Sequence, residues 1–364
     1  MILDPQSNPS RPLDTARTDA FGDRVLAALN EASVLLMMSI GHRTGLFETM
    51  SRLEPSTSEE IAAAAGLDER YVREWLGALA VGRVIDVDDL GRFSLPPEHA
   101  ALLTAAGEAD LGVFAGYIPV LGSVEDDIIR CFREGGGVPY SRFDRFHELM
   151  AEDSGQTVLP ALHSHILPLV SGLRERLGQG IDIADLGCGR GRALLDLASH
   201  FPASAFVGYD LSSEAIAHAT AQAEAQGLTN IRFEVRDLSD FDVTAEPHAF
   251  DLVTTFDAVH DQAKPANLLR GIRRSLRPSG VYLMQDIHAH SHLHGNMDHP
   301  VGPFLYTVSC MHCMTVSLAQ GGDGLGTMWG RERATKMLHE AGFSKVEIHQ
   351  LDHDFQNDYY VVRP

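Results

Sequence analysis

The chain has 364 residues, of which 44% are hydrophobic and 22% charged, so it can bury a substantial core and is neither disordered nor fibrous. Its net charge of −21, from 29 basic and 50 acidic residues, argues against nonspecific binding to nucleic acid or anionic membranes. Four cysteines and a polar start without a secretory signal favour a cytoplasmic protein with reduced thiols. The longest apolar run, around Val34–Ile40, is far shorter than a bilayer span, so we expect no membrane partner.

The first elements are predicted to be a flexible arm followed by an apolar helix. Residues 1–20 lack periodicity and contain three prolines, which indicates the arm. Apolar residues recur at helical spacing from Asp23 to Met50. Within this helix, Ala32–Ile40 is apolar on nearly all sides and needs more cover than its own domain provides. A second copy of the chain is the simplest cover, so we expect a homodimer.

The pattern that follows, within residues 21–98, is typical of a winged helix-turn-helix. Ser58 heads a short helix, and Asp68 caps a second one over residues 69–81. Two short strands around the turn 88–91 complete a hairpin. Residues 1–150 contain 13 arginines and no lysines against 24 acidic residues, which disfavours contact with DNA phosphates. We therefore interpret residues 21–98 as a dimerisation domain and expect no nucleic-acid partner.

Residues 99–180 are predicted to be a helical linker or lid, interrupted by the glycines and proline of 135–139. Tyr140 directly follows this break and either faces a substrate pocket or packs on the surface. From residue 181 to 364, β-rich runs alternate with helical runs, which predicts an α/β, doubly wound sheet. The expected strands are Ile181–Leu186, Ala205–Tyr209, Ile231–Val235, Leu252–Thr255, Val281–Gln285, Lys345–His349 and Tyr359–Val362.

The strongest motif is the glycine-rich loop at the end of the first of these strands. The run Asp185 to Gly191 reads Asp-Leu-Gly-Cys-Gly-Arg-Gly and opens a helix, an arrangement in which glycines let a ligand approach the backbone. It is not the dinucleotide pattern, because Arg192 stands where that pattern has glycine. Asp210 ends the next strand and could accept both hydroxyls of a ribose. Asp237 ends the third strand and could accept from an adenine amine.

These residues resemble the class I S-adenosylmethionine-dependent methyltransferases, with a Rossmann-like, seven-stranded sheet. The loop matches the first motif of that family, and Asp210 matches its ribose-binding acid. The resemblance implies S-adenosyl-L-methionine as cofactor. Cys188 is interpreted as a small filler in the loop rather than a nucleophile. The implied cofactor-binding residues are Asp185, Gly187, Gly189, Gly191, Asp210, Leu211, Asp237, Leu238, Phe256 and Asp257.

A second resemblance begins after the fourth strand, where His260 and Asp261 follow directly. This run, with the Pro-x-Gly turn 278–280, is similar to small-molecule O-methyltransferases that carry a winged-helix dimerisation domain. In that family a His-Asp pair at this place supplies the general base, which implies His260 and Asp261 as catalytic residues. Imidazole suits the role because it titrates in the useful pH range. The alternative is that His260 only packs or caps.

The match departs from the family at Gln262, where a tryptophan is usual. The segments 299–303 and 311–315 look more like a bacterial winged-helix methyltransferase group whose substrates are unassigned. The resemblance implies a small-molecule acceptor in which oxygen is the favoured methyl-accepting atom, with sulfur or nitrogen as alternatives. His288 and His312, with Tyr140, are candidates to line its pocket.

Histidines and cysteines in the segment 286–313 raise the question of a metal. His288, His290, His292 and His294 alternate, and Cys310 and Cys313 form a Cys-x-x-Cys. The spacing matches no common zinc motif, and a polar loop beside buried thiols explains it as well, so we expect no metal there. A function from another class also remains open: a winged-helix regulator that senses S-adenosylmethionine without catalysis.

Overall fold

A computed structural model of the chain describes residues 13–105 and 110–364. Residues 1–12 of the predicted arm lie outside the described part. The chain divides into two compact units, residues 1–119 and 120–364. The boundary thus lies inside the segment predicted as a linker, and neither 98 nor 180 separates the units.

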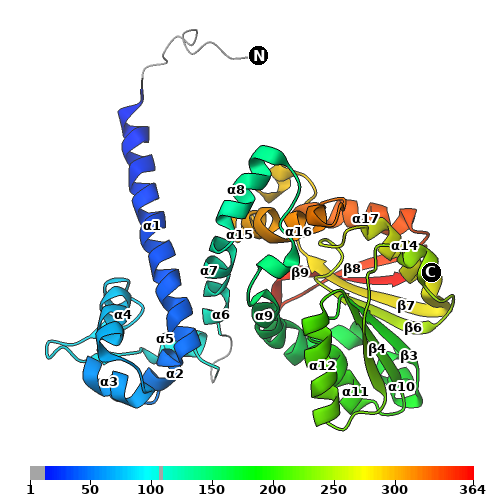
Figure 1. Ribbon diagram of the computed structural model, residues 1–364, viewed down its shortest axis with the longest axis horizontal. Helices are drawn as coiled ribbons and strands as arrows, with labels where there is room; N and C mark the ends of the chain where they lie inside the picture. Colours follow the sequence, from blue (N-terminus) through cyan, green and yellow to red (C-terminus); the bar gives the residue numbers. More distant parts are fainter. Residues whose placement is uncertain (1–12, 106–109) are drawn as a thin grey trace. The chain divides into compact units, whose positions relative to one another are not determined.

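The first unit is helical with a small two-stranded hairpin (Figure 1). Its elements are α1 (Thr15–Thr44), α2 (Leu46–Met50), α3 (Ser58–Ala65), α4 (Glu69–Val81), β1 (Asp86–Val87), β2 (Phe93–Ser94), α5 (Pro97–Leu103) and α6 (Gly112–Ala115), and α7 (Tyr117–Gly122) crosses the unit boundary.

Two predictions about the first helix are corrected. It begins at Thr15, where the Asp14 side chain accepts a hydrogen bond from the Arg17 amide, so residues 15–20 are not an arm. It also ends at Thr44 instead of continuing to Met50. Gly45 adopts φ 70°, a left-handed conformation that glycine accepts readily, and α2 starts after it.

The predicted winged-helix elements are present in the first unit. Thr57, one residue before the expected Ser58, caps α3 in a capping box with Glu60, and Asp68 caps α4 as expected. Phe47 and Trp75 are buried in the core between these helices, and the Trp75 indole donates to the Met37 carbonyl of α1 at 2.8 Å. This contact fixes the C-terminal half of α1 to the winged helix.

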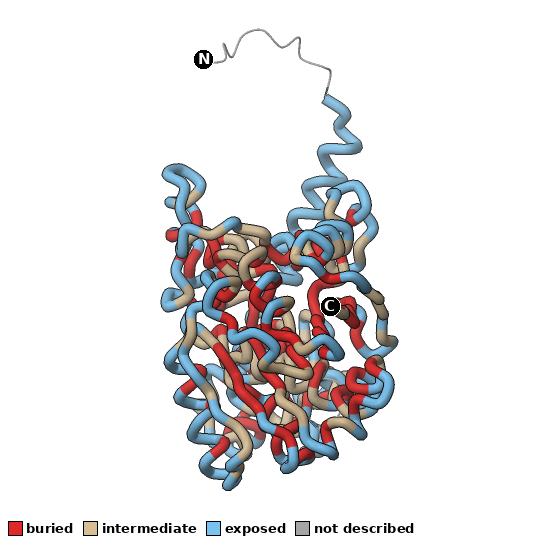
Figure 2. The backbone as a smooth tube through the Cα atoms, turned by 90° about the vertical axis from the view of Figure 1, so that its right-hand side faces the viewer, coloured by how far each residue is buried: buried red, intermediate tan, exposed pale blue. Residues whose placement is uncertain are grey.

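The N-terminal half of α1 is exposed over its whole length (Figure 2). Its apolar side chains include Leu26 and Leu29, which are 61% and 63% exposed, while Val34 and Met38 pack against the core of the unit. The uncovered apolar stripe therefore begins before the predicted Ala32–Ile40 and includes Leu36 and Ile40 within it. By length and composition alone, α1 is long and apolar enough to cross a membrane, although its longest continuous apolar run is short. The buried core helix of a soluble protein and a signal sequence near the N-terminus pass the same test, so this finding by itself assigns no membrane span.

The second unit is built around a seven-stranded sheet. Its strands are β3 (Asp182–Leu186), β4 (Ala205–Asp210), β5 (Ile231–Val235), β6 (Phe250–Phe256), β7 (Leu276–Ile287), β8 (Lys345–Leu351) and β9 (Asp354–Arg363), in the order β5-β4-β3-β6-β7-β9-β8. All neighbours pair in parallel except β9, which is antiparallel to both β7 and β8. The predicted doubly wound α/β sheet is confirmed.

Helices cover both faces of this sheet. Those before it are α8 (Glu125–Glu134), η1 (Tyr140–Arg142), α9 (Phe146–Ala161), η2 (Leu162–Ile166), η3 (Leu167–Leu169) and α10 (Leu173–Gln179). Between and after the strands come α11 (Arg192–His200), α12 (Ser213–Ala225), α13 (Phe241–Thr244), α14 (Pro265–Ser275), η4 (Leu293–Asn296), α15 (Gly302–Val308), η5 (Ser309–Cys313), α16 (Met314–Ala319), η6 (Thr327–Trp329) and α17 (Gly330–Glu340).

The buried core of the second unit forms one cluster on each sheet face. One face packs against α13, α14 and α17, and the other packs against α11, η2 and α10. Leu162, Ile166 and Leu173 belong to the second cluster and are buried. The helices preceding β3 are therefore part of the sheet domain and not a separate linker.

Candidate active site

The sheet order places the two sequence motifs next to each other. After β3, the chain moves outward through β4 and β5 and then returns to the other side of β3 as β6. The carboxyl ends of β3 and β6 are neighbours at this reversal, which is where doubly wound sheets bind ligands. The glycine loop follows β3, and the segment from Asp257 to His260 follows β6.

The glycine loop requires its glycines. Gly187, Gly189 and Gly191 all have positive φ, and a Cβ at Gly191 would lie 2.5 Å from the Phe233 ring. At Gly189 nothing lies within 4 Å of a built Cβ, so its backbone borders open space. Asp210 supports the loop, accepting from the Gly189 amide at 2.8 Å.

Two other loop residues have raised pKa values. Asp185 accepts from Thr254 at 2.8 Å, and its burial raises its pKa to about 7. Burial likewise raises the pKa of the Cys188 thiol well above its ordinary value, so the thiol stays protonated. That is consistent with the interpretation of Cys188 as a filler, since its reactive thiolate is disfavoured.

The remaining predicted cofactor residues differ in position. Leu211 is exposed beside Asp210, and Asp237 is exposed at the end of β5 with an oxygen accepting from the Ser239 amide. Phe256 is partly buried at the end of β6. Leu238 is buried in the same core cluster as Phe241, and its role in binding the cofactor stays a prediction.

His260 forms the central polar contact of the site. Its Nδ1 lies 2.8 Å from Asp286 Oδ1, and the two side chains are only 5% and 1% exposed. A carboxylate can only accept, so Nδ1 carries the proton of this bond and Nε2 is left as the basic atom. The same Asp286 oxygen accepts from the Trp329 indole at 2.9 Å and from the Ile287 amide at 2.8 Å.

Asp286 also sets the basicity of His260. Burial by itself would lower the pKa of His260, but the charge of Asp286 and their hydrogen bond outweigh it, so this pKa lies well above its usual value. Asp257 lies in the same group, with one oxygen within 4.8 Å of the ligand atoms of both residues. Burial, reinforced by the charge of Asp286, raises the pKa of Asp257 well above its usual value. Its φ of 51° marks a strained backbone at this position.

The carboxylate that orients His260 is therefore the more distant Asp286, and the catalytic role of Asp261 stays a prediction. Asp261 accepts from the Gln262 amide group at 3.3 Å, and no hydrogen bond joins it to His260 among the described residues. Burial raises its pKa to about 6. Sequence reasoning missed Asp286, although its position beside the end of a predicted strand was a usable signal.

Two of the three predicted substrate residues come together. Tyr140 packs edge-on against His312 with ring centroids 5.1 Å apart and stacks on His147 at 4.5 Å. Phe143 and Phe146 complete this aromatic cluster around His312. Burial, and then the charges of His260 and His147, lower the pKa of His312 well below its usual value, so the ring is neutral.

His288 is not part of that cluster. Its Nδ1 lies 3.0 Å from Asp358 and 3.1 Å from the Arg331 guanidinium, in a separate polar group. Its role in the acceptor pocket stays a prediction.

The cysteines do not gather with the alternating histidines. Cys313 is buried, and its Sγ lies 3.7 Å from His312 Nδ1. Among the described residues, two groups could offer three metal ligands, and neither contains a cysteine or any histidine of the segment 288–294. One of the two is Asp257, His260 and Asp286.

Comparison with protein families identifies a known domain in each of the two units. Residues 32–105 match the Rv2258c-like winged HTH domain, and residues 177–342 match a methyltransferase domain. The chain combines a winged helix-turn-helix domain with a domain of the methyltransferase family. This confirms the family resemblance and the fold class that the sequence predicted.

Curated relatives match parts of the chain. A trans-aconitate 2-methyltransferase from Deinococcus radiodurans is 34% identical over 110 residues, which are 30% of this chain and 39% of that protein. A ubiquinone biosynthesis O-methyltransferase from Neisseria meningitidis is 27% identical over 161 residues, 42% of this chain and 64% of that protein. The chain thus matches less than two thirds of the length of either relative.

Solved structures match nearly the whole chain at low identity. The mitomycin 7-O-methyltransferase MmcR aligns with a TM-score of 0.70 and 17% identity, covering 96% of this chain and all of that one. Human N-acetylserotonin methyltransferase in complex with SAM gives a TM-score of 0.67 and 17% identity, covering 97% and 99%. These likenesses establish the shared fold.

Proposed function

We propose that this protein is an S-adenosylmethionine-dependent methyltransferase that methylates a hydroxyl oxygen of a small molecule, with His260 as the general base. The observation that carries the proposal is the buried His260–Asp286 pair at the same sheet edge as the glycine loop. Relatives and structural neighbours named as O-methyltransferases support oxygen as the acceptor atom.

The residues of the glycine loop fit the proposed cofactor. Asp210 accepts one backbone amide on each carboxylate oxygen, from Gly189 and Ser212, both at 2.8 Å. Each oxygen keeps a further lone pair that could accept a ribose hydroxyl. The open backbone at Gly189 leaves room for the amino-acid part. When bound, S-adenosylmethionine supplies an electrophilic methyl group on sulfur.

The task of the protein is to hold the acceptor and remove its proton. His260 Nε2 takes the hydroxyl proton, while Nδ1 remains hydrogen bonded to Asp286. The imidazolium that forms is stabilised by the buried carboxylate, which Trp329 and Ile287 keep in place. A hydroxyl is a weaker acid than a thiol, so a positioned base accelerates methyl transfer to a hydroxyl more than transfer to a thiol.

The aromatic cluster suggests the chemical class of the acceptor. His260 acts on the neutral His312, since its charge contributes to the lowered pKa of His312, and Tyr140 packs against His312. His312 Nε2 is buried without a hydrogen-bond partner in the described part of the chain. The aromatic rings around His312, together with its uncharged Nε2 atom, favour a planar, uncharged acceptor that carries a hydroxyl.

We further propose that the winged helix serves dimerisation. On α4, Arg70 and Arg73 form ion pairs with Glu74 and Glu69 of the same helix, which leaves few charges for DNA phosphates. The exposed apolar stripe on the N-terminal half of α1 is suited to a second copy of the chain.

Removing Asp210 tests cofactor binding. The variant Asp210→Ala loses the acceptor for the ribose hydroxyls and one support of the loop, so affinity for S-adenosylmethionine should fall by about 2–4 kcal/mol. Calorimetric titration measures this. Asp242→Ala, at an exposed ion pair on α13, is the control and should bind as the wild type does. Equal affinity of Asp210→Ala and wild type would contradict the assignment.

Removing His260 tests catalysis. His260→Ala should retain S-adenosylmethionine binding, while the rate of methyl transfer to a hydroxylated aromatic panel falls by about 10²–10⁴. In the wild type the rate should rise with pH and level off at a pH above 6.5, because the base must be deprotonated and Asp286 raises the pKa of His260. The variant should lose this step.

The control for catalysis is His218→Ala, an exposed position on α12 that should leave the profile unchanged. A loss under about threefold in His260→Ala would exclude an essential base. It would then favour transfer to sulfur by proximity. Circular dichroism confirms that both variants are folded.

Light scattering tests the dimer. The wild type should have the mass of two chains at micromolar concentration, and Leu26→Glu should shift it towards one chain, because a charge in an apolar interface is costly. Val81→Glu, at an exposed apolar position on α4, should remain dimeric. A wild-type mass of one chain would overturn the proposal.

A further inference from the structure

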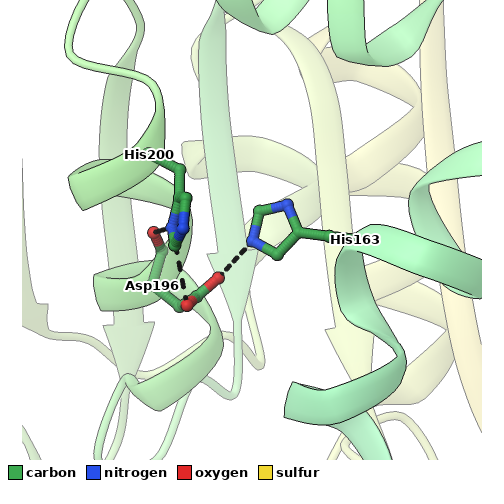
Figure 3. A group of neighbouring side chains, drawn as sticks. All are labelled: His163, Asp196 and His200. Carbon is green, nitrogen blue, oxygen red and sulfur yellow. Dashed lines mark hydrogen bonds and ion pairs between the residues drawn. The ribbon is translucent and has the colours of Figure 1, made fainter.

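A second group of metal-ligating side chains lies away from the site described above. It consists of His163 on η2 and of Asp196 and His200 on α11 (Figure 3). Helix α11 starts directly after the glycine loop and ends at His200, so the group sits near the opposite end of that helix. At about 1.5 Å per residue, the helix separates it from the loop by roughly 10 Å.

The three side chains converge on one point. His163 Nε2 lies 2.5 Å from Asp196 Oδ2, and His200 Nδ1 lies 3.6 Å from Asp196 Oδ1. His200 Nδ1 donates to the backbone carbonyl of Asp196 at 2.9 Å, which leaves Nε2 of His200 with the lone pair that can bind a metal ion. The two imidazole rings are 4.5 Å apart, on either side of the carboxylate, as Figure 3 shows. One ligand atom from each residue lies within 4.8 Å of the other two.

Local backbone structure brings these donors together. Asp196 and His200 are four residues apart and so share one face of α11. His163 comes from η2, a π-helical turn that follows α9, and such turns often occur at functional sites. Leu162 and Ile166 of the same turn are buried in the sheet core, which fixes the direction of His163.

A divalent cation is an alternative to simple ion pairing in this group. Among the described residues, Asp196 forms ion pairs with these two histidines and with no lysine or arginine. Two protonated rings would repel each other at 4.5 Å, so without a metal ion one protonated ring compensates the carboxylate. A divalent cation can take the place of that proton, because it compensates the carboxylate and accepts a lone pair from each imidazole.

We propose that His163, Asp196 and His200 bind one divalent transition metal ion, with Zn²⁺ the best match to two imidazoles and one carboxylate. Asp196 and His200 are 32% and 53% exposed, so solvent can complete the coordination. The ion joins η2 to α11 and thereby braces the helix that carries the glycine loop at its other end.

Zinc binding to the full chain tests the site. After treatment with a chelator and dialysis, the wild type should take up one Zn²⁺ per chain, measured by elemental analysis after equilibrium dialysis. Its melting temperature should rise with Zn²⁺ and return to the initial value with EDTA, because a ligand of the folded state stabilises it. Co²⁺ in place of Zn²⁺ should give the visible absorption of a bound, low-symmetry ion.

Matched variants locate the ion. His163→Gln and His200→Gln should weaken zinc binding by at least about tenfold. His218→Gln, at an exposed histidine on α12, should bind zinc as the wild type does. His260→Gln separates this site from the active-site group and should also retain binding.

The proposal is overturned if the wild type takes up no zinc under these conditions. It is also overturned if His163→Gln and His200→Gln bind zinc as tightly as His218→Gln. Loss of binding in His260→Gln alone would place the ion in the active site and contradict the proposal.

Discussion

One buried carboxylate organises the proposed active site. Asp286 lies in the buried C-terminal part of β7, and a single oxygen of its side chain accepts from His260, Trp329 and the Ile287 amide. These donors come from the segment after β6, from η6 and from β7 itself. The carboxylate therefore fixes the base, orients its basic nitrogen and raises its pKa at the same time. If this charge were lost, burial would dominate and would lower the pKa of His260.

The sheet reversal explains why the two halves of the site meet. Gly189 and Asp210 present backbone and carboxylate on one side of the reversal, and His260 stands on the other. Cofactor and acceptor can thus be held by separate elements and still face each other across a short gap. The strained Asp257, with a raised pKa, keeps a second negative charge from accumulating beside Asp286.

Local patterns in the sequence predicted most of the architecture. Strand positions followed from short apolar runs, and Gly187 to Gly191 marked the loop because only glycine tolerates its backbone. Partners across the fold were harder to predict. Asp261 is adjacent to His260 in sequence, yet Asp286 is its partner, since the β6–β7 pairing brings the two strand ends together. His163 and Asp196 are also distant in sequence, and no local pattern predicts that they are partners.

The titration of His260 tests this account most directly. Nuclear magnetic resonance of histidine-labelled protein, with the signal assigned by His260→Gln, gives its pKa in the wild type and in Asp286→Asn. The account predicts a wild-type pKa well above 6.5 and a much lower value in Asp286→Asn, because burial then acts without the compensating charge. The same pKa in both proteins would contradict the central role of the carboxylate.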